Sequence, residues 1–430
     1  MKKEFEGKKL LILGGIRTSM TIVERAQAMG IYTIVADYDE NSPAKAIADK
    51  AVLIDATDVD AIVKFCREEK VDGITTGYVD ILLRGWDKMC RELDVPCYLT
   101  EKMLNMALDK VEFKKTCEQY DVPVPKTYFV GGELTQTVLE QIAYPVFVKP
   151  LDASGSRGCG VCYNEEELLA QFAQALSFSR SRNCVVEQFL TGREFLLDYI
   201  GVDGEFRLVE MFDRYKTPDR GSAMNFANIS IAPSFAIDNY YKTVDEKVRN
   251  MFKQLGFRDG LIFLQGFVDG DRITFYEMGC RLGGTNYILE EACSGYVSHD
   301  MVIRHALTGK MLPSIDMLKK DIAKFSRYGV LMNFLLLGGD ETIHTVKGIE
   351  QANQMPNAVR VKQVRFEGDY YAKDTIVDKA VASVHFTADT VEEIRDTIRY
   401  LNNVVEVTNR EGKSLVTMPF DPQDLEDYES

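Results

Sequence analysis

The chain has 430 residues, of which 46% are hydrophobic and 27% charged, a balance typical of a globular protein with roughly two to four packed lobes. Its 51 basic and 66 acidic residues give a net charge of −15, which argues against a nucleic-acid partner or an anionic membrane surface. No apolar run approaches the roughly 18 residues of a membrane helix, and the N-terminus lacks the apolar core of a secretory signal. Nine dispersed cysteines fit reduced thiols, so we expect a cytoplasmic protein.

The first hundred residues alternate between short apolar runs and segments with helical spacing. Such alternation predicts a parallel, doubly wound α/β sheet, which we assign to a leading domain at 1–100. The helix at 18–30 should end at Gly30, because glycine readily adopts the left-handed conformation that closes helices. Strands are expected at 9–13, 31–36, 51–54, 71–76 and 96–99.

Residues 101–320 show a different pattern, in which strands are joined by tight turns such as Asp269-Gly-Asp271. Helices are expected at 165–176 and 238–255, so this part is α+β. A break near Pro313 precedes a third region, 321–430, which is also α+β. We expect strands there at 328–337 and 381–387, a helix at 391–402, and a frayed acidic end at 421–430.

Lys110 is the first candidate phosphate ligand. Asp109 can cap a helix that starts at Lys110, and Glu112 completes the Asp-x-x-Glu capping pattern. A lysine in the first turn is disfavoured by the helix dipole, so this position makes sense if the ammonium group reaches an external anion. A solvated surface lysine is the alternative interpretation.

Lys149 ends the apolar strand 146–148, where a charged group is costly unless it is paired. The loop that follows is rich in small residues whose backbone N–H groups can approach phosphate oxygens. Its candidate ligands are Ser154, Gly155, Ser156, Arg157 and Gly158. Neither the GxxxxGK[ST] loop nor the GxGxxG dinucleotide motif is present. Together the lysine and the loop predict a phosphate site, although a plain turn would also fit the loop.

Glu187 and Glu194 flank a short connection that contains Gly192, so both carboxylates can face one cleft. One carboxylate can accept a hydrogen bond from an adenine amino group, and the other can accept from ribose hydroxyls. The alternative is a pair of exposed glutamates at strand ends.

Glu277 interrupts an otherwise apolar strand, so it needs a partner, and magnesium accepts carboxylate oxygen. Arg281 can neutralise charge that builds on a transferring phosphoryl group. Gly283 and Gly284, which precede a helix at 287–293, could offer backbone N–H groups to a substrate anion.

The cysteines and histidines suggest no other chemistry. Cys159 and Cys162 have CxxC spacing, but no second ligand pair lies nearby to complete a metal site. No Ser/His/Asp arrangement is found. Among four dispersed histidines, His299 lies near the candidate site, although an ordinary core or surface role is the simpler interpretation.

Taken together, these segments resemble the ATP-grasp superfamily over nearly the whole chain. The branches it most resembles are the amino-acid ligases and the carbamoyl-phosphate-synthetase-like enzymes, and the phrase at 37–49 is typical of their first domain. The resemblance implies two ATP-grasp lobes at about 101–190 and 191–320, followed by a C-terminal lobe. It also implies ATP with Mg²⁺ or Mn²⁺ as cofactors, small-molecule carboxylate and amine substrates, and possible homodimers.

The resemblance also implies roles for individual residues. Lys110 and Lys149 would bind phosphates under a flap formed by 154–158, and Arg281 would steady an acyl phosphate. Glu277 would hold the metal. The adenine would be held by Glu187 with the backbone of Gln188, Phe189 and Leu190, and the ribose by Glu194.

Two positions depart from the family pattern. Gln265 stands where a second acidic metal ligand is usual, and Gly279 stands where asparagine is usual. A glutamine oxygen ligates magnesium without charge, and glycine has no ligating side chain. We therefore expect weaker metal binding, or completion of the metal shell by another group such as Asn286.

The leading functional hypothesis is an ATP-dependent carboxylate–amine ligase that acts through an acyl phosphate. A second is an ATP-dependent carboxylase or ligase of purine-ribotide biosynthesis, whose substrate phosphate should need basic residues in the leading domain; Arg17 is the obvious one. A third is a non-catalytic nucleotide-binding homologue, motivated by Gln265 and Gly279. A nicotinamide dehydrogenase is disfavoured, because Gly-Gly-Ile-Arg replaces GxGxxG after the first strand.

Overall fold

The computed structural model describes residues 4–152, 157–216, 227–283, 287–372, 380–416 and 419–428. Its leading unit is a four-stranded parallel sheet in the order β3-β2-β1-β4. The strands are β1 (Lys9–Leu13), β2 (Tyr32–Ala36), β3 (Lys50–Val52) and β4 (Gly73–Thr75). Helices α1 (Ser19–Ala28), α2 (Val59–Glu69) and α3 (Leu83–Leu93) connect or follow them. The doubly wound prediction is confirmed.

Residues 96–99, which we expected to form a fifth strand, form none; Pro96 lacks a backbone donor for a ladder. Tyr98 and Leu99 are nevertheless buried, which explains why the run is apolar. The chain passes from here into α4 (Glu101–Leu108) and α5 (Lys110–Gln119). Asp109 caps α5, because its carboxylate accepts from the backbone N–H groups of Val111 and Glu112. The capping prediction is confirmed.

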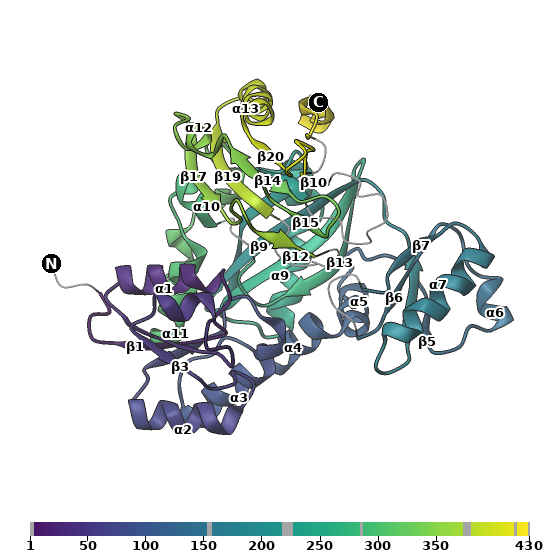
Figure 1. Ribbon diagram of the computed structural model, residues 1–430. Coiled ribbons are helices and arrows are strands. Elements are labelled where there is room, and N and C mark those ends of the chain that lie inside the picture. The colour runs from purple at the N-terminus through teal and green to yellow at the C-terminus, as the bar shows by residue number, and fades with distance from the viewer. Residues whose placement is uncertain are drawn as a thin grey trace.

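A small lobe follows and projects away from the rest of the molecule (Figure 1). Its antiparallel sheet has the order β5-β8-β6-β7. The elements are β5 (Thr127–Gly131), α6 (Gln136–Leu139), β6 (Val146–Pro150), β7 (Gly160–Cys162), α7 (Glu165–Phe178) and β8 (Cys184–Gln188). The lobe has a separate apolar core, in which Val148 and Val186 of the sheet are clustered with Phe172 of α7.

An eight-stranded antiparallel sheet forms the centre of the molecule, in the order β13-β12-β9-β10-β11-β14-β19-β17. The strands are β9 (Arg193–Val202), β10 (Glu205–Lys216), β11 (Ala227–Ala232), β12 (Gly260–Asp269), β13 (Arg272–Gly279), β14 (Tyr328–Leu335), β17 (Ala358–Gln363) and β19 (Ala380–Ala388). The sheet runs through the expected boundary near residue 320, because β11 pairs directly with β14. The division into lobes at 320 remains a prediction.

Helices and short strand pairs complete the fold. The helices are α8 (Ile237–Thr243), α9 (Asp245–Gln254), α10 (Tyr287–Ser294), α11 (Ser298–Thr308), α12 (Ile349–Asn353) and α13 (Val391–Val404). The strand pairs are β15 (Glu341–Thr342) with β18 (Tyr370–Tyr371) and β16 (Thr345–Lys347) with β20 (Glu406–Thr408). The single helix expected at 238–255 is two helices. They meet at Val244, where α9 starts with buried Asp245 accepting from the Tyr199 hydroxyl at 2.6 Å.

The acidic end is docked rather than frayed up to Tyr428, which corrects that expectation. Arg193 pairs with Asp427 at 2.7 Å, and the Tyr428 hydroxyl donates to buried Asp213 at 2.6 Å. These contacts bind the end of the chain onto β9 and β10. Local composition predicts solvation for such a segment, whereas its partners lie more than 200 residues earlier in the chain.

The leading sheet and the central sheet share one apolar core, which extends from Phe5 to Ala323. Helix α11 packs against β4 so closely that a Cβ added at Gly73 would lie 2.1 Å from the Ala306 carbonyl oxygen. The leading unit therefore packs against the central unit through a shared core, whereas the small lobe has a separate core.

We expect Gly73→Ala to lower the free energy of unfolding by about 1–3 kcal/mol, because the backbones of β4 and α11 must separate. Gly85→Ala in α3 is the matched control. Its Cβ would meet its nearest atom at 3.7 Å, so the change should be neutral or stabilising. Urea denaturation of both variants measures the difference, and equal stabilities would refute the tight contact.

Candidate active site

A buried carboxylate between two lysines joins the small lobe to α5. Glu187 of β8 lies 2.7 Å from the Lys149 Nζ of β6, and its other oxygen contacts the Lys114 Nζ of α5. All three side chains are buried. Lys114 was not identified from the sequence, although it lies one helical turn beyond Lys110 on the same face of the helix.

More charges gather around Lys149. Burial lowers the pKa of Lys149 well below its ordinary value, and the ammonium groups of Lys114 and Lys110 lower it further. Glu277 acts in the opposite direction, which places its carboxylate within electrostatic reach of Lys149. Lys110, Lys149 and Glu277 thus meet in one region although they come from α5, β6 and β13. An arriving polyphosphate would stabilise the charged form of these lysines.

The glycine-rich loop is described only in its second half, so Ser154, Gly155 and Ser156 lie outside the described residues. Gly158 is held on α7, where its carbonyl accepts from the Gln171 side chain at 3.0 Å. It has a φ of +74°, and a Cβ there would lie 2.8 Å from the Phe178 ring. Only glycine fits this position. Arg157 precedes it at the loop's described edge, and its phosphate role remains a prediction.

Glu194 of β9 is buried among cations of β10. It lies 2.7 Å from the Lys216 Nζ and 3.2 Å from Arg214, and it accepts from the Tyr276 hydroxyl at 2.6 Å. Burial raises the pKa of Glu194, but Arg214 and Lys216 outweigh this effect and hold it below the ordinary value. Glu194 is therefore an ionised acceptor, as ribose hydroxyls require. The segment that contains Arg214 and Lys216 was expected to line the acceptor region, whereas their pairing with Glu194 was not predicted.

The expected adenine-binding segment connects the two lobes at the end of β8. Backbone N–H groups of Gln188 and Phe189 donate to the Lys126 and Pro145 carbonyls at 2.8 and 3.3 Å. A small cavity of about 30 Å³ opens beside this segment. It is lined by residues 188–191 and, from the central sheet, by Phe267, Asp269, Arg272 and Thr274. Phe267 offers this cavity an aromatic side chain.

The expected metal ligands face each other across β12 and β13, where Gln265 pairs with Glu277 in register. The Gln265 Oε1 accepts from the Tyr276 hydroxyl at 3.1 Å. Glu277 makes no hydrogen bond or ion pair with another residue in the described ranges. One available carboxylate and one amide oxygen fit magnesium when phosphate oxygens and water complete its shell.

Phe263 explains the glycine at position 279. The two residues pair in register, and a Cβ added at Gly279 would lie 2.1 Å from the Phe263 ring. The aromatic ring thus fills the space that a side chain at 279 would use. It also supports Arg281, whose guanidinium lies 5.1 Å from the ring centroid.

Arg281 forms a two-point ion pair with Asp80 of the leading unit. Its Nε and Nη2 donate to the two carboxylate oxygens at 2.6 and 2.9 Å. Asp80 was not identified from the sequence. Gly283 has open space around it, as an anion-binding position requires, whereas Gly284 and Asn286 lie outside the described residues. A guanidinium and a carboxylate thus lie side by side where the leading and central units meet.

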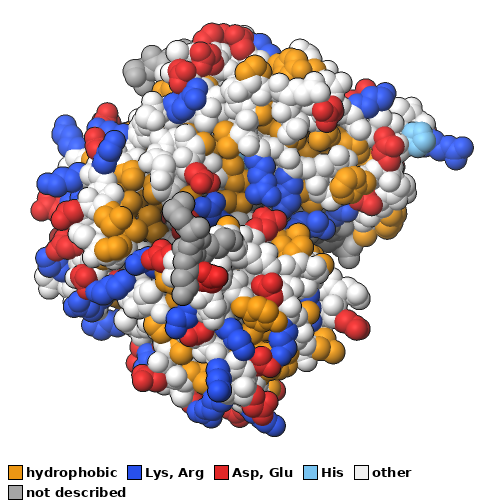
Figure 2. Space-filling view, turned by 90° about the vertical axis from the view of Figure 1, so that its left-hand side faces the viewer, with side chains coloured by type: hydrophobic (Ala, Val, Ile, Leu, Met, Phe, Trp, Pro, Cys, Tyr) orange, Lys and Arg blue, Asp and Glu red, His pale blue; other side chains and the backbone are white. Residues whose placement is uncertain are grey.

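The face in Figure 2, which is the left-hand side of Figure 1, shows Lys and Arg side chains gathered near its centre. Acidic and basic side chains alternate around the rim. A chain with a net charge of −15 therefore still gathers basic side chains locally on its surface.

Three buried carboxyls lie behind Arg281, with oxygens of Asp198, Glu210 and Glu290 within 4.8 Å of one another. Burial raises the pKa of Asp198 to about 6 and that of Glu290 to about 8, and Asp198 adds to the rise at Glu290. Carboxylates so close in the interior repel one another, which favours binding of a proton within the cluster, above all at Glu290.

This cluster predicts a stability that falls as pH rises. The folded chain binds protons that the unfolded chain has released above about pH 4. The stabilising contribution is therefore full below that pH and is lost as the pH rises through about 6 and then 8. Asp198→Asn should flatten the decline between pH 5 and 8 in urea denaturation, while Asp271→Asn at an exposed turn should not. An unchanged slope in Asp198→Asn would mean that no proton is shared.

Comparison with known proteins agrees with this geometry. Residues 109–313 match the family described as the carbamoyl-phosphate synthase L chain ATP-binding domain, and 10–84 match the PylC-like N-terminal domain. A formate-dependent phosphoribosylglycinamide formyltransferase of Sulfurisphaera tokodaii is 26% identical over 414 residues, covering 94% of this chain and 98% of the relative.

Solved structures show the same fold. An L-amino acid ligase from Bacillus licheniformis superposes with a TM-score of 0.76 at 18% identity, covering 94% of this chain and 99% of that one. A phosphoribosylglycinamide synthetase from Anaerococcus prevotii gives 0.75 at 19% identity, covering 94% and 100%. Among the described residues, no helix is both long and apolar enough to cross a membrane.

The match to an ATP-binding domain over residues 109–313, together with the relatives, defines an ATP-dependent enzyme of the C–N ligase class, with ADP as a product. The chain belongs to the ATP-grasp superfamily, as the sequence resemblance indicated.

Proposed function

We propose that this chain joins a carboxylate to an amine at the expense of ATP, through an acyl phosphate. The observation that carries the proposal is the convergence of Lys110, Lys149 and Glu277 in one region. Arg281 follows Glu277 four residues later in the chain. A carboxylate oxygen attacks the γ-phosphorus and ADP leaves. The amine then attacks the acyl carbon, phosphate leaves, and the amine proton passes to phosphate or water.

The chain's own residues position and neutralise rather than transfer protons. Lys110 and Lys149 hold the phosphates, Glu194 accepts from the ribose, and Glu187 accepts from the adenine amino group. Arg281 offsets the charge on the reacting phosphoryl group. Glu277 with Gln265 would hold magnesium, which would supply positive charge to offset that of the phosphates.

The relatives support a carboxylate and an amine as the substrate pair. The formyltransferases are named for formate, which is a carboxylate, and the solved amino acid ligase is named for substrates that carry both groups. We propose an amino acid or peptide as the first choice of substrate.

The loop after β1 favours this choice over a substrate with a phosphate group. The Gly15 N–H donates to the Asp37 carboxylate at 2.6 Å, and the Gly14 N–H donates to the Ala36 carbonyl. These donors are therefore used within the protein, and the Asp37 charge would repel a phosphate.

The second candidate is an ATP-dependent carboxylase or ligase of purine-ribotide biosynthesis, in the form of phosphoribosylglycinamide formylation. A specific observation favours it, because the formyltransferase match extends over 98% of that relative's length. Arg17 is exposed two residues after Gly15, so it is a cation that a ribotide phosphate could use.

A substrate screen separates the candidates. ADP release is measured with Mg-ATP and amino acid pairs, and in parallel with formate and phosphoribosylglycinamide, followed by mass spectrometry of the product. A dipeptide supports the first candidate and a formylated ribotide the second. ATP binding without turnover on either panel would indicate a non-catalytic homologue and sink both.

We expect Lys149→Met to reduce turnover by at least about a hundredfold while the fold survives. The fold survives because Glu187 keeps Lys114 as a partner, so no buried charge is left alone. The control is Lys126→Met, because the Lys126 side chain is exposed and lies over the Tyr128 ring. Wild-type turnover in Lys149→Met would remove this lysine from the site.

We expect Gln265→Glu to lower the Mg²⁺ concentration that gives half-maximal ADP formation, by about threefold to tenfold, because it supplies a second charged ligand. A magnesium titration at fixed ATP measures the shift, and Gln174→Glu on the exposed face of α7 serves as the control. No change in Gln265→Glu would place residue 265 outside the metal shell.

A further inference from the structure

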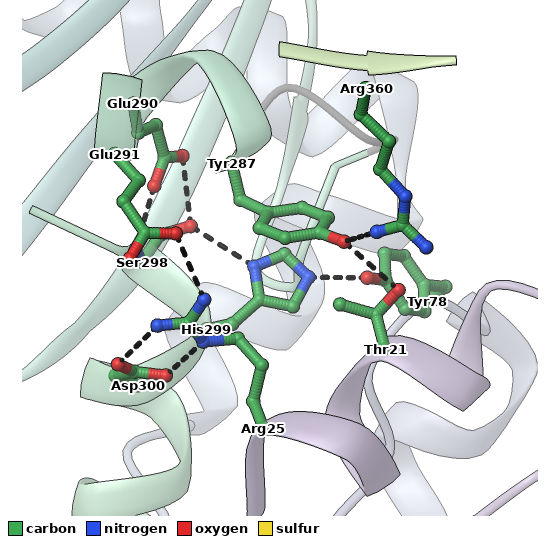
Figure 3. Close-up of polar contacts among 10 residues, drawn as sticks. All are labelled: Thr21, Arg25, Tyr78, Tyr287, Glu290, Glu291, Ser298, His299, Asp300 and Arg360. Atoms are coloured by element: carbon green, nitrogen blue, oxygen red, sulfur yellow. Dashed lines mark hydrogen bonds and ion pairs between the residues drawn. The ribbon is translucent and has the colours of Figure 1, made fainter. Parts of the chain in front are cut away.

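A hydrogen-bonded network centred on His299 lies outside the nucleotide cleft (Figure 3). His299 is on α11 and only 1% exposed. Its Nε2 contacts the hydroxyl of Tyr78, from the loop after β4, and its Nδ1 lies 3.4 Å from the Ser298 Oγ. The ring centroid of Tyr287 lies 4.2 Å from that of His299. The imidazole is thus enclosed by groups from both the leading and the central units.

The hydrogen-bond partners of His299 favour one tautomer of its ring. The Ser298 hydroxyl donates to the Glu290 Oε1 at 2.9 Å, so its oxygen is left to accept from the His299 Nδ1–H. The Nε2 then has a lone pair and accepts from the Tyr78 hydroxyl. Burial lowers the pKa of His299 to about 3, so the imidazole stays neutral and keeps this arrangement.

Tyr287 extends the network to the third part of the chain. Its hydroxyl donates to Thr21 of α1 at 3.3 Å and accepts from Arg360 of β17 at 2.8 Å. Beside it, Arg25 of α1 donates to both oxygens of Asp300 at 2.5 and 2.8 Å. The leading unit is therefore held in one orientation against α10 and α11.

The Tyr78 hydrogen bond matters because of what else its loop contacts. Two residues along the chain, Asp80 forms the two-point pair with Arg281. One residue before, the Gly77 carbonyl accepts from the Leu282 N–H at 3.1 Å. The loop 77–80 thus contacts residues 281–282 through Gly77 and Asp80, one on each side of Tyr78. A shift of Tyr78 would move Asp80, and the Arg281 guanidinium would move with it.

We propose that His299 is a positioning residue, which holds the 77–80 loop through Tyr78 and so fixes Asp80 and Arg281 for the carboxylate-activating step. This inference rests on the proposed function, because it concerns the same reacting centre. It assigns His299 no contact with substrate and no proton transfer. Its effect is on geometry, where a displacement of about 1 Å can cost a hundredfold in rate.

His305 provides a matched control on the same helix. It is 3% exposed, and its ring packs edge-on against Tyr98 at a centroid distance of 5.3 Å. Its Nδ1 has no hydrogen-bond partner among the described residues. His305→Leu and His299→Leu therefore both remove a buried imidazole from α11. Only His299 is hydrogen-bonded to the 77–80 loop.

The experiment compares Tyr78→Phe, His299→Leu, His299→Gln and His305→Leu with the wild type. Three quantities are measured: ATP affinity by calorimetry, kcat and KM for the carboxylate substrate, and amide hydrogen exchange of the peptide spanning 77–83. We expect Tyr78→Phe and His299→Leu to lose roughly 10- to 100-fold in kcat/KM for the carboxylate. ATP affinity should stay within about twofold, and exchange in 77–83 should quicken.

His299→Gln should recover part of the loss, because a carboxamide can accept from the Tyr78 hydroxyl. His305→Leu should leave exchange in 77–83 and the carboxylate kcat/KM near wild type. Equal losses at both histidines, a parallel fall in ATP affinity, or unchanged exchange in His299→Leu would each overturn the inference. A wild type that releases no ADP with any substrate would instead overturn the proposed function, while the exchange result still decides whether His299 holds the loop.

Discussion

The Lys114–Glu187–Lys149 triad is the interaction on which the arrangement of the site depends. Two ammonium groups and one carboxylate are removed from water together, and each is tolerated in the interior because the others are present. The triad has two amino groups for one carboxylate, and burial lowers the pKa of both Lys114 and Lys149, so an arriving polyphosphate would stabilise their charged forms. The triad also fixes β6, β8 and α5 relative to one another before any ligand arrives.

The separate apolar cores indicate that the small lobe can move relative to the leading and central units. The leading and central units share one continuous core, so they behave as a single support. The small lobe keeps its own core and meets that support at the proposed nucleotide site. Lys149 and the glycine-rich loop are carried by the small lobe, whereas Glu277 and Arg281 are carried by the support. A nucleotide that contacts both sides therefore joins two separately folded bodies.

The substitutions at the metal site follow from packing as much as from chemistry. Gly279 cannot carry a side chain while Phe263 occupies its space, and Phe263 in turn lies under Arg281. The Phe263 ring thus fills the space of the asparagine that is usual at position 279, and the same ring supports Arg281. Gln265 is held by Tyr276, which also donates to Glu194, so the proposed metal ligand and the proposed ribose acceptor share one hydroxyl. These links make the two halves of the nucleotide site depend on each other.

The sequence by itself determined the features that arise from local spacing. Alternating apolar runs gave the leading parallel sheet, Asp109 before Lys110 gave the helix cap, and a lysine at the end of a buried strand marked the cleft. Short-range periodicity and capping follow from neighbouring residues, so they can be inferred without a fold. Residues 96–99 show the limit of this reasoning, because an apolar run can be buried without forming a strand.

Only the tertiary structure decided which charges meet. Lys114 pairs with Glu187 across 73 residues, Arg281 with Asp80 across 201, and His299 with Tyr78 across 221. Likewise, the acidic end is docked by Arg193 and Asp213, and β11 pairs with β14 across the expected domain boundary. Such pairings depend on strand order and on which faces pack together. From the sequence alone, a charged residue is expected to be solvated. Only the fold shows that it is buried and which residue pairs with it.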